Sequence, residues 1–207
     1  KELLSNSFNI NCIKFSTNDN KIYIAKFYNR KINGFNAIKS EIANLKFLKK
    51  LKLNYFPKVN SNSNDHYLIM SYIDNEPLQA DGISQSFLNA LTNIHKNKGN
   101  FYGFAFDTQH GGLKQQNKKS DNWINFYANY RLGYIYEIIN KFNKMDDSIN
   151  RRIELLLKNL NNFIPRNPSS NLLHGDLWEG NILFKNNHLV GLIDPGSFYG
   201  HNELELA

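Results

Sequence analysis

The sequence predicts an α+β protein of two unequal lobes, a small β-rich lobe followed by a larger, mainly helical one. In the first third of the chain, short apolar runs separated by polar turns are typical of strands. After residue 83 the apolar residues recur mostly at helical spacing, and short strands return only near the end. This change of periodicity places the boundary within residues 73–78, and we assign residues 1–74 to the first lobe and 75–207 to the second.

Each element of the first lobe has a local signal. Residues 12–16 and 22–28 are strand-like runs joined by the polar turn 17–20, which predicts a hairpin. Residues 35–51 carry apolar side chains near helical spacing with Glu and Lys between them, so we expect an amphipathic helix. The apolar run 67–73 lies between two polar stretches and predicts a buried strand followed by a connector.

The second lobe is expected to hold three helices and a late hairpin. The helices are indicated by apolar faces in residues 83–95, 123–142 and 149–163. Residues 100–120 are rich in glycine and glutamine and show no period, which predicts a long loop. Short apolar runs near the end predict three strands and one tight turn, at residues 172–173, 182–184 and 189–193 with the turn at 185–188.

Composition excludes several classes of protein. The 207 residues are 41% hydrophobic and have a mean hydropathy of -0.53, as in ordinary globular proteins. The apolar runs are far shorter than the roughly 20 residues of a membrane-spanning helix. A single cysteine, Cys12, excludes an internal disulfide or a cysteine-clustered metal site and fits a reducing compartment. We therefore expect a cytoplasmic protein without membrane contact, present as a monomer or weak dimer.

The charge balance points to an anionic partner such as a nucleotide, a nucleic acid or an anionic surface. The chain has 25 Lys and Arg against 18 Asp and Glu, a net charge of +7, which suggests an anionic partner such as a nucleotide. Most of the lysines are scattered and are explained by a solvated surface. The aromatic residues lie on apolar helical faces rather than within a basic stripe, so we do not expect nucleic acid as a partner.

One segment has the residues that phosphoryl transfer requires. His174-Gly175-Asp176 opens it, Asn181 closes it, and Asp194 follows after the predicted hairpin. Transfer from a nucleotide uses one carboxylate to accept the proton of the attacking hydroxyl, and an asparagine and an aspartate to hold Mg²⁺. The return strand of the hairpin would bring Asp194 to the same mouth as Asp176 and Asn181, and Mg²⁺ prefers oxygen ligands. His174 is interpreted as structural rather than catalytic.

The first lobe supplies the other groups of the same template. Lys26 ends the strand-like sequence Tyr-Ile-Ala-Lys, which is similar to the Val-Ala-Ile-Lys element of protein kinases, and Glu41 lies one turn into the following helix. The ammonium would neutralise phosphate oxygens, and the carboxylate would orient it by an ion pair. The strand 67–73 falls where kinases have the hinge, whose backbone hydrogen-bonds adenine.

These motifs resemble those of the fructosamine kinase family, relatives of the aminoglycoside and choline kinases. The resemblance is carried by His-Gly-Asp-Leu-Trp-x-Gly-Asn at residues 174–181 and by Asp-Pro-Gly-Ser-Phe-Tyr-Gly-His-x-Glu at 194–203. The aromatic and glycine pattern of residues 102–132 is similar to that family's long substrate-side loop and following helix. The resemblance implies a protein-kinase-like fold and an ATP- and Mg²⁺-dependent kinase acting on ketosamines, the sugar adducts of amines. The phosphorylated product then decomposes and frees the amine.

The resemblance also implies a role for each motif residue. Asp176 is the catalytic base, Asn181 and Asp194 hold Mg²⁺, and Trp178 faces the sugar, with core packing as the alternative for this indole. Trp123 and Arg131 are further candidates for contact with the substrate. Helix packing would explain Trp123 equally well, and a surface charge would explain Arg131 equally well. Two sets of residues are expected to bind the nucleotide, namely Lys26 with Glu41 at the phosphates, and Met70, Ser71, Tyr72 and Ile73 at the adenine.

The sequence departs from the family pattern at three places. Residues 4–10, expected to turn over the phosphates, contain no glycine, although glycine permits close backbone approach. Glu179 stands where the family usually has a small residue. Family members continue with further helices beyond the position of Ala207, so we expect the helical lobe to be incomplete here.

Two other functions compete with a ketosamine kinase. One is a small-molecule kinase of the aminoglycoside or choline kinase type, which shares the Asp, Asn and Asp of the site. The other is a kinase-fold protein that binds nucleotide with little or no transfer, which the missing glycines and the short C-terminus would favour.

Overall fold

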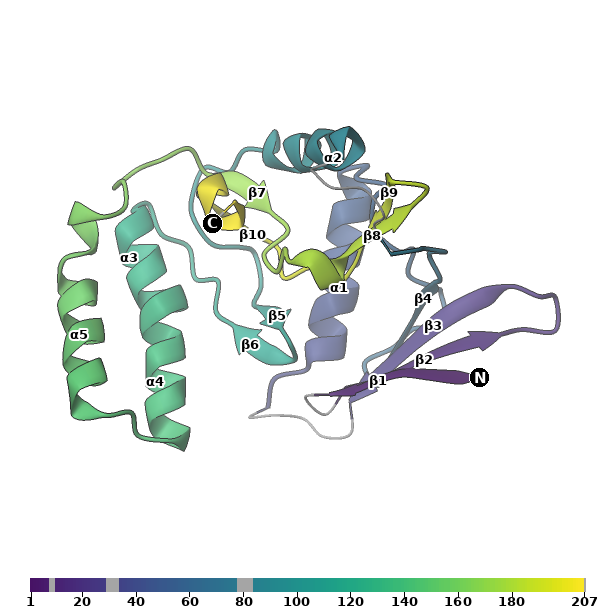
Figure 1. Cartoon of the computed structure of the whole chain (residues 1–207), viewed down its shortest axis with the longest axis horizontal. Helices are drawn as coiled ribbons and strands as arrows, with labels where there is room; N and C mark the ends of the chain where they lie inside the picture. The colour runs from purple at the N-terminus through teal and green to yellow at the C-terminus, as the bar shows by residue number, and fades with distance from the viewer. Residues whose placement is uncertain (8–9, 29–33, 78–83, 207) are drawn as a thin grey trace.

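The computed structural model describes residues 1–7, 10–28, 34–77 and 84–206. Its N-terminal part is a four-stranded antiparallel sheet in the order β1-β2-β3-β4, seen at one end of the molecule in Figure 1. The strands are β1 (Glu2–Ser7), β2 (Ile10–Ser16), β3 (Ile22–Tyr28) and β4 (Tyr67–Ser71). The predicted hairpin is confirmed, because β2 pairs with β3 and its end residues Ser16 and Ile22 face each other.

Strand β1 is an element that the sequence analysis missed. Residues 4–10 were expected to form a turn over the phosphates, but the segment up to Ser7 lies in a strand that pairs with β2. The polar Ser5, Asn6 and Ser7 give this strand no apolar alternation, so its place at the sheet edge has no signal in the sequence. Residues 8–9, which belong to the expected turn, lie outside the described residues.

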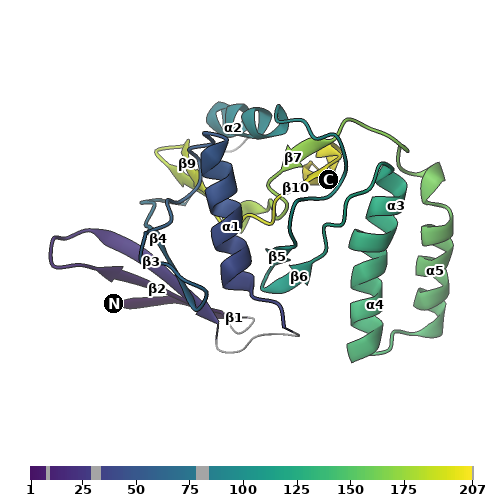
Figure 2. The ribbon, with the colours of Figure 1, turned by 180° about the vertical axis from the view of Figure 1, so that it is seen from behind.

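Helix α1 (Ala37–Lys50) confirms the predicted amphipathic helix and crosses the middle of the molecule (Figures 1 and 2). Asn36 caps it, because its side-chain oxygen accepts a hydrogen bond from the Lys39 amide at 2.9 Å. The apolar face is buried through Ile38, Leu45 and Leu48. Three polar residues of this helix, Ser40, Glu41 and Asn44, are buried as well, and they contact the functional site described below.

The remainder of the described chain is mainly helical and contains three two-stranded antiparallel sheets. Its helices are α2 (Gln85–His95), α3 (Trp123–Tyr127), α4 (Gly133–Phe142) and α5 (Asp147–Lys158). Its strands pair as β5 (Thr108–His110) with β6 (Leu113–Gln115), β7 (Asn171–Leu173) with β10 (Phe198–Gly200), and β8 (Ile182–Lys185) with β9 (His188–Leu192). Figures 1 and 2 show α4 and α5 side by side at the end opposite the N-terminal sheet. None of the described helices is long and apolar enough to cross a membrane.

The predicted helices and strands of this part are largely confirmed, with three differences. Strand β10, which pairs with β7, was not predicted. The single helix expected over 123–142 is divided by a π-helical turn, Ala128–Leu132, between α3 and α4. The stretch 100–120, predicted as a loop, contains the hairpin β5–β6. The strands of this hairpin have three residues each, too few for alternation to be visible in the sequence.

The aromatic core beneath α3 overturns two interpretations of the sequence. Trp123 is 2% exposed and stacks on Phe126 with ring centroids 5.6 Å apart, so the prediction that it contacts the substrate is wrong and helix packing explains it. Arg131 is not a surface charge, because its guanidinium lies over the rings of Phe126 and Phe198. It also donates hydrogen bonds to the Gln116 carbonyl and to Asn117 Oδ1, both at 2.7 Å.

Replacing Trp123 with alanine is expected to lower the free energy of unfolding by about 3–5 kcal/mol, because a fully buried aromatic side chain is lost and a cavity remains. Phe142→Ala is the matched control, since this ring is 75% exposed, and we expect a change within about 0.5 kcal/mol. Urea denaturation followed by circular dichroism measures both. Equal effects of the two substitutions would contradict the assigned core.

Candidate active site

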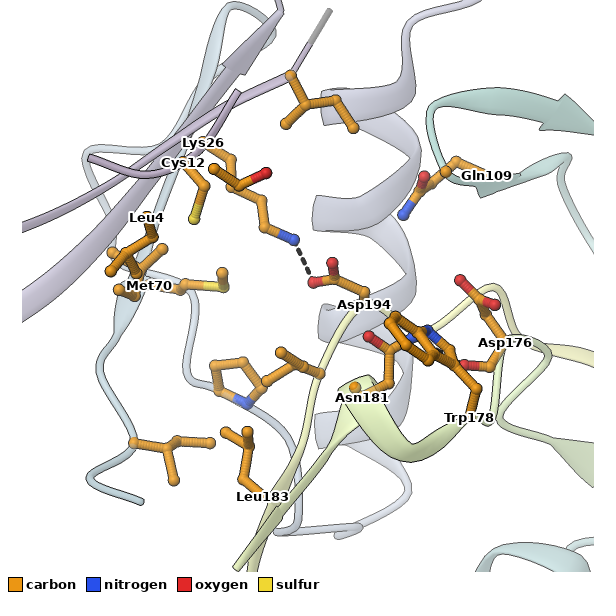
Figure 3. A pocket seen from close by; sticks show the side chains of 18 of the residues that line it. Leu4, Cys12, Lys26, Met70, Gln109, Asp176, Trp178, Asn181, Leu183 and Asp194 are labelled. Atoms are coloured by element: carbon orange, nitrogen blue, oxygen red, sulfur yellow. Dashed lines mark hydrogen bonds and ion pairs between the residues drawn. The ribbon is translucent and has the colours of Figure 1, made fainter. Parts of the chain in front are cut away.

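A cavity of about 820 Å³ lies between the N-terminal sheet and the loops that follow β7 and β9 (Figure 3). Most of the site residues predicted from the sequence line it, namely Lys26, Met70, Ser71, Tyr72, Ile73, Asp176, Trp178, Asn181 and Asp194. Glu41 is 1% exposed and lies behind Lys26 instead, and Trp123 belongs to the core. The prediction that Asp176, Asn181 and Asp194 lie together is confirmed, because all three line this cavity.

Lys26 joins the sheet to the rest of the site. Its Nζ donates to Glu41 Oε1 at 3.0 Å and forms a second ion pair with Asp194 Oδ1, drawn as the dashed line in Figure 3. The predicted ion pair with Glu41 is therefore confirmed. Burial alone would lower the pKa of Lys26, but the charges of Asp194 and Glu41 outweigh it and raise this pKa above its ordinary value. The ammonium stays charged beside the cavity.

Helix α1 holds three separate parts of the site in one geometry. Glu41 contacts Lys26 of the sheet, and Asn44 Nδ2 donates to the Pro195 carbonyl at 2.7 Å, next to Asp194. Ser40 Oγ donates to the Asp107 carbonyl at 2.9 Å, just before strand β5. These polar residues of a helix are buried because each one satisfies a group of a neighbouring element.

The loop that carries Asp176 passes very close to the loop that carries Asp194. Gly175 has a φ of 86°, and a Cβ at this position would lie 2.1 Å from the carbonyl oxygen of Gly196. Only glycine allows both the left-handed backbone and this approach. Asp194 itself has a φ of 56°, a conformation that aspartate tolerates better than most residues.

Glu205 anchors the same loop from the C-terminal side. Its side chain is 4% exposed, and Oε1 accepts a hydrogen bond from the Gly175 amide at 2.6 Å. Oε2 lies 2.9 Å from Nε2 of His95, the last residue of α2. A buried carboxylate that binds a backbone amide in this way fixes the loop position, so Glu205 is a positioning residue for Asp176.

Asp176 has the environment of a general base. Burial raises the pKa of its carboxyl, opposed by the nearby His110 and His174. His110 Nδ1 lies 3.3 Å from Asp176 Oδ1 and comes from the end of β5. Asn181 Nδ2 donates to the Asp176 backbone carbonyl at 2.8 Å. A carboxylate with a raised pKa that faces a cavity can accept a proton from a bound hydroxyl.

His174 is structural, as interpreted from the sequence. It is fully buried, and burial lowers the pKa of its imidazole, so the ring is neutral near pH 7. The ring stacks on Phe56, with centroids 5.8 Å apart, and Nδ1 accepts a hydrogen bond from the Asp176 amide at 3.3 Å. The histidine thus supports the backbone that carries Asp176.

The two ends of the cavity differ in chemistry. One end is apolar, lined by Ile24, Met70, Tyr72, Ile73, Leu183 and Ile193. The other end holds Lys26, Asp194, Asn181 and Asp176, as Figure 3 shows. A molecule with a flat apolar ring and an anionic tail matches this division.

The oxygen donors suit a cation that is shared with a ligand. No group of three or more His, Cys, Asp or Glu side chains that could hold a metal occurs among the described residues. Asn181 uses its Nδ2 on the Asp176 carbonyl, so its oxygen remains as an acceptor beside Asp194. One carboxylate and one amide oxygen fit Mg²⁺, which is usually bound by one or two protein oxygens together with phosphates and water.

Glu205, His110 and Asn44 are the site residues that the sequence analysis missed. Glu205 lies outside every element that the sequence predicts, and the structure has a short 3-10 helix there, Asn202–Glu205. His110 lies in the stretch taken as a loop without period. Glu205 contacts Gly175, which lies 30 residues away, and His110 contacts Asp176, which lies 66 residues away. Spacing along the chain does not reveal such distant pairs.

Comparison with known proteins gives one consistent family. A family model described as fructosamine kinase matches residues 7–207. The chloroplastic protein-ribulosamine 3-kinase of Arabidopsis thaliana is 34% identical over 148 residues, which cover 68% of this chain and 43% of the plant protein. Mouse ketosamine-3-kinase is 36% identical over 106 residues, 51% of this chain and 34% of the mouse protein. The chain thus spans less than half the length of either relative.

Solved structures confirm the predicted two-lobed, protein-kinase-like α+β fold. A candidate fructosamine-3-kinase from Thermobifida fusca superposes with a TM-score of 0.81 at 23% identity, over 97% of this chain and 69% of the other. An aminoglycoside phosphotransferase superposes with a TM-score of 0.67 at 16% identity, over 99% of this chain and 69% of the other.

Removing the Glu205 carboxylate is expected to destabilise the loop that carries Asp176. Glu205→Ala leaves the half-buried Gly175 amide without its charged partner, which should cost about 1.5–3 kcal/mol of folding free energy. Glu203→Ala is the control, because that side chain is 76% exposed. Chemical denaturation gives both values, and amide hydrogen exchange should become faster at residues 174–176 only in the Glu205 variant. Unchanged exchange there would contradict the anchoring role.

Proposed function

The chain belongs to the fructosamine kinase family, and from this we propose that it transfers the γ-phosphoryl group of ATP to a sugar hydroxyl of a ketosamine. The observation that carries the proposal is the meeting of Lys26, Asp176, Asn181 and Asp194 around one cavity. It is supported by the relatives, which are named for phosphorylating ribulosamines and ketosamines. The products of such a kinase decompose and release the amine, so the protein would act in deglycation.

ATP fits the two ends of the cavity. We assign the apolar end, with Met70, Ser71, Tyr72 and Ile73, to the adenine. Lys26 neutralises phosphate oxygens, and Glu41 keeps the ammonium aimed at the cavity. The ion pair between Lys26 and Asp194 leaves both groups poised at the polar end, one for anionic oxygens and the other for a cation.

Asn181 and Asp194 would hold Mg²⁺ through their side-chain oxygens. When bound, this ion neutralises charge on the phosphates. Asp194 carries the negative charge that the cation requires, and its side chain is 35% exposed toward the cavity. The hydrogen bond from Asn181 Nδ2 to the Asp176 carbonyl fixes the orientation of the amide, so its oxygen rather than its nitrogen is presented.

Asp176 serves as the general base of the transfer. It accepts the proton of the acceptor hydroxyl while the hydroxyl oxygen bonds to the γ-phosphorus and the bond to the β,γ-bridging oxygen breaks. The raised pKa that burial gives this carboxyl makes it a stronger base than an exposed aspartate. Glu205 and Asn181 hold the backbone of the loop, so the carboxylate keeps its position.

Trp178 forms the acceptor side of the site. Its indole is 58% exposed and borders the cavity beside Asp176 (Figure 3). An indole face packs well on the C–H surface of a sugar.

The sequence-based assignments of lobes, location and oligomeric state are part of the same proposal. The first lobe ends at Asp74. The single cysteine favours a reducing compartment, so we assign the activity to the cytoplasm. We propose that the protein is a monomer or weak dimer.

Asp176→Asn is expected to lower turnover of fructosyl-lysine or ribulosyl-lysine by roughly 10²–10⁴-fold, because the asparagine cannot take up the proton. Asp65→Asn is the control, an exposed aspartate whose long ion pair with Lys39 spans 3.5 Å. Mass spectrometry detects a gain of one phosphate on the ketosamine. Turnover that survives Asp176→Asn would contradict the role of this residue. Phosphorylation of choline or an aminoglycoside instead of any ketosamine would contradict the proposed substrate.

A further inference from the structure

A second cavity, of about 670 Å³, lies against the other side of the catalytic loop. It shares Asn75, Trp178, Gly180 and Leu183 with the catalytic cavity, so the two spaces meet at the indole of Trp178. Phe87 and Phe184 contribute apolar walls. We call this second cavity the tryptophan groove. A molecule that reaches Asp176 past Trp178 could continue into it.

The indole that borders both spaces packs against the backbone of Gly180. A Cβ added to Gly180 would lie 2.3 Å from the edge of the Trp178 ring, so the ring occupies the room that a side chain at position 180 would need. The ring nevertheless is 58% exposed. An accessible aromatic face attracts a cation or an aliphatic chain that ends in one.

Two carboxylates line the tryptophan groove. Glu76 follows the connector after β4, and its amide donates to the Phe184 carbonyl at 2.7 Å, which attaches this segment to strand β8. Glu179 comes directly after the indole. Both residues are exposed, and neither enters an ion pair within the described parts of the chain. Lys185, the nearby cation, is paired with Asp74 and interacts with Glu76 only at longer range.

This negative local charge is opposite to that of the whole chain, whose net charge is +7. Phosphates are disfavoured here by two carboxylates, and Lys26 already offers them a site in the catalytic cavity. A positively charged side chain in the groove is attracted by Glu76, by Glu179 and by the indole face, all of which line it. The charge complementarity therefore selects a cation as the occupant.

We propose that the tryptophan groove binds an arginine or lysine side chain that flanks the glycated lysine of a peptide or protein substrate. The inference rests on the proposed ketosamine kinase activity and assigns Glu76, Glu179 and Trp178 as residues that determine specificity. The sugar occupies the catalytic cavity at Asp176, and the neighbouring cationic side chain lies across the indole between the two carboxylates. The kinase then prefers ketosamines in basic surroundings.

The test compares three peptides of equal length, each with one fructosyl-lysine flanked by arginine, glutamine or glutamate. With the whole protein, we expect KM to be about fivefold lower for the arginine peptide than for the glutamine peptide, the size expected of exposed ion pairs and cation–π contacts. The glutamate peptide should have the highest KM. The ratio between the arginine and glutamine peptides should shrink in 0.5 M salt, which screens exposed charges.

Variants separate this groove from a general effect of charge. The ratio to follow is KM for the glutamine peptide divided by KM for the arginine peptide. Glu179→Gln and Glu76→Gln should each reduce this ratio by about twofold or more, and the double variant should bring it near 1. Glu137→Gln is the matched control, because this exposed glutamate on α4 lies outside both cavities, and it should keep the wild-type ratio.

Two kinds of result would overturn the inference, and they are distinguishable. Turnover of all three peptides with equal KM, or a ratio that Glu137→Gln changes as much as Glu179→Gln, would contradict the groove while leaving the kinase activity intact. Absence of phosphorylation with every ketosamine would contradict the proposed function, and the inference would fall with it.

Discussion

The site depends on one buried cation, the ammonium of Lys26, which is 6% exposed and contacts Glu41 and Asp194. A charge at such a position is strongly destabilising unless opposite charges surround it. The three residues come from β3, α1 and the segment after β9, so their pairing ties the sheet, the central helix and the end of the β8–β9 hairpin into one geometry. The same grouping is what a nucleotide with its cation needs, because phosphate oxygens and Mg²⁺ can each take over one of these charges.

The other parts of the site are positioned by contacts with the residues next to this Lys26–Glu41–Asp194 pairing. Asn44 on the next turn of α1 donates to the Pro195 carbonyl, which attaches the segment of Asp194 to the helix. Gly175 and Gly196 let the loop of Asp176 approach the loop of Asp194, and Glu205 holds the Gly175 amide from behind. Asp176 is thus fixed relative to Lys26 through backbone contacts rather than through a direct side-chain bond. Such preorganisation is what general-base catalysis requires.

Local sequence patterns predicted the elements that depend on local forces. The strands around Lys26, the helix with Glu41 and the hairpin between Asn181 and Asp194 have clear periodicity or turn residues, and all are present. Strands β1 and β10 and hairpin β5–β6 were missed because they are short or polar and form through pairing with neighbours. Glu205 and His110 have distant partners, so no spacing pointed to them. Trp123 shows the opposite error, because a tryptophan beside substrate-like motifs proved to fill the core.

The most direct test of the account is to compare the binding of ATP and adenosine by isothermal titration calorimetry, in the wild type and in Lys26→Met and Lys39→Met. Lys39 is the control, since its side chain is 68% exposed. If the Lys26 ammonium holds the phosphates, Lys26→Met should weaken ATP binding by roughly tenfold or more and leave adenosine binding within about twofold, while Lys39→Met changes neither. Equal loss of ATP and adenosine affinity, or no loss of either in Lys26→Met, would contradict the account.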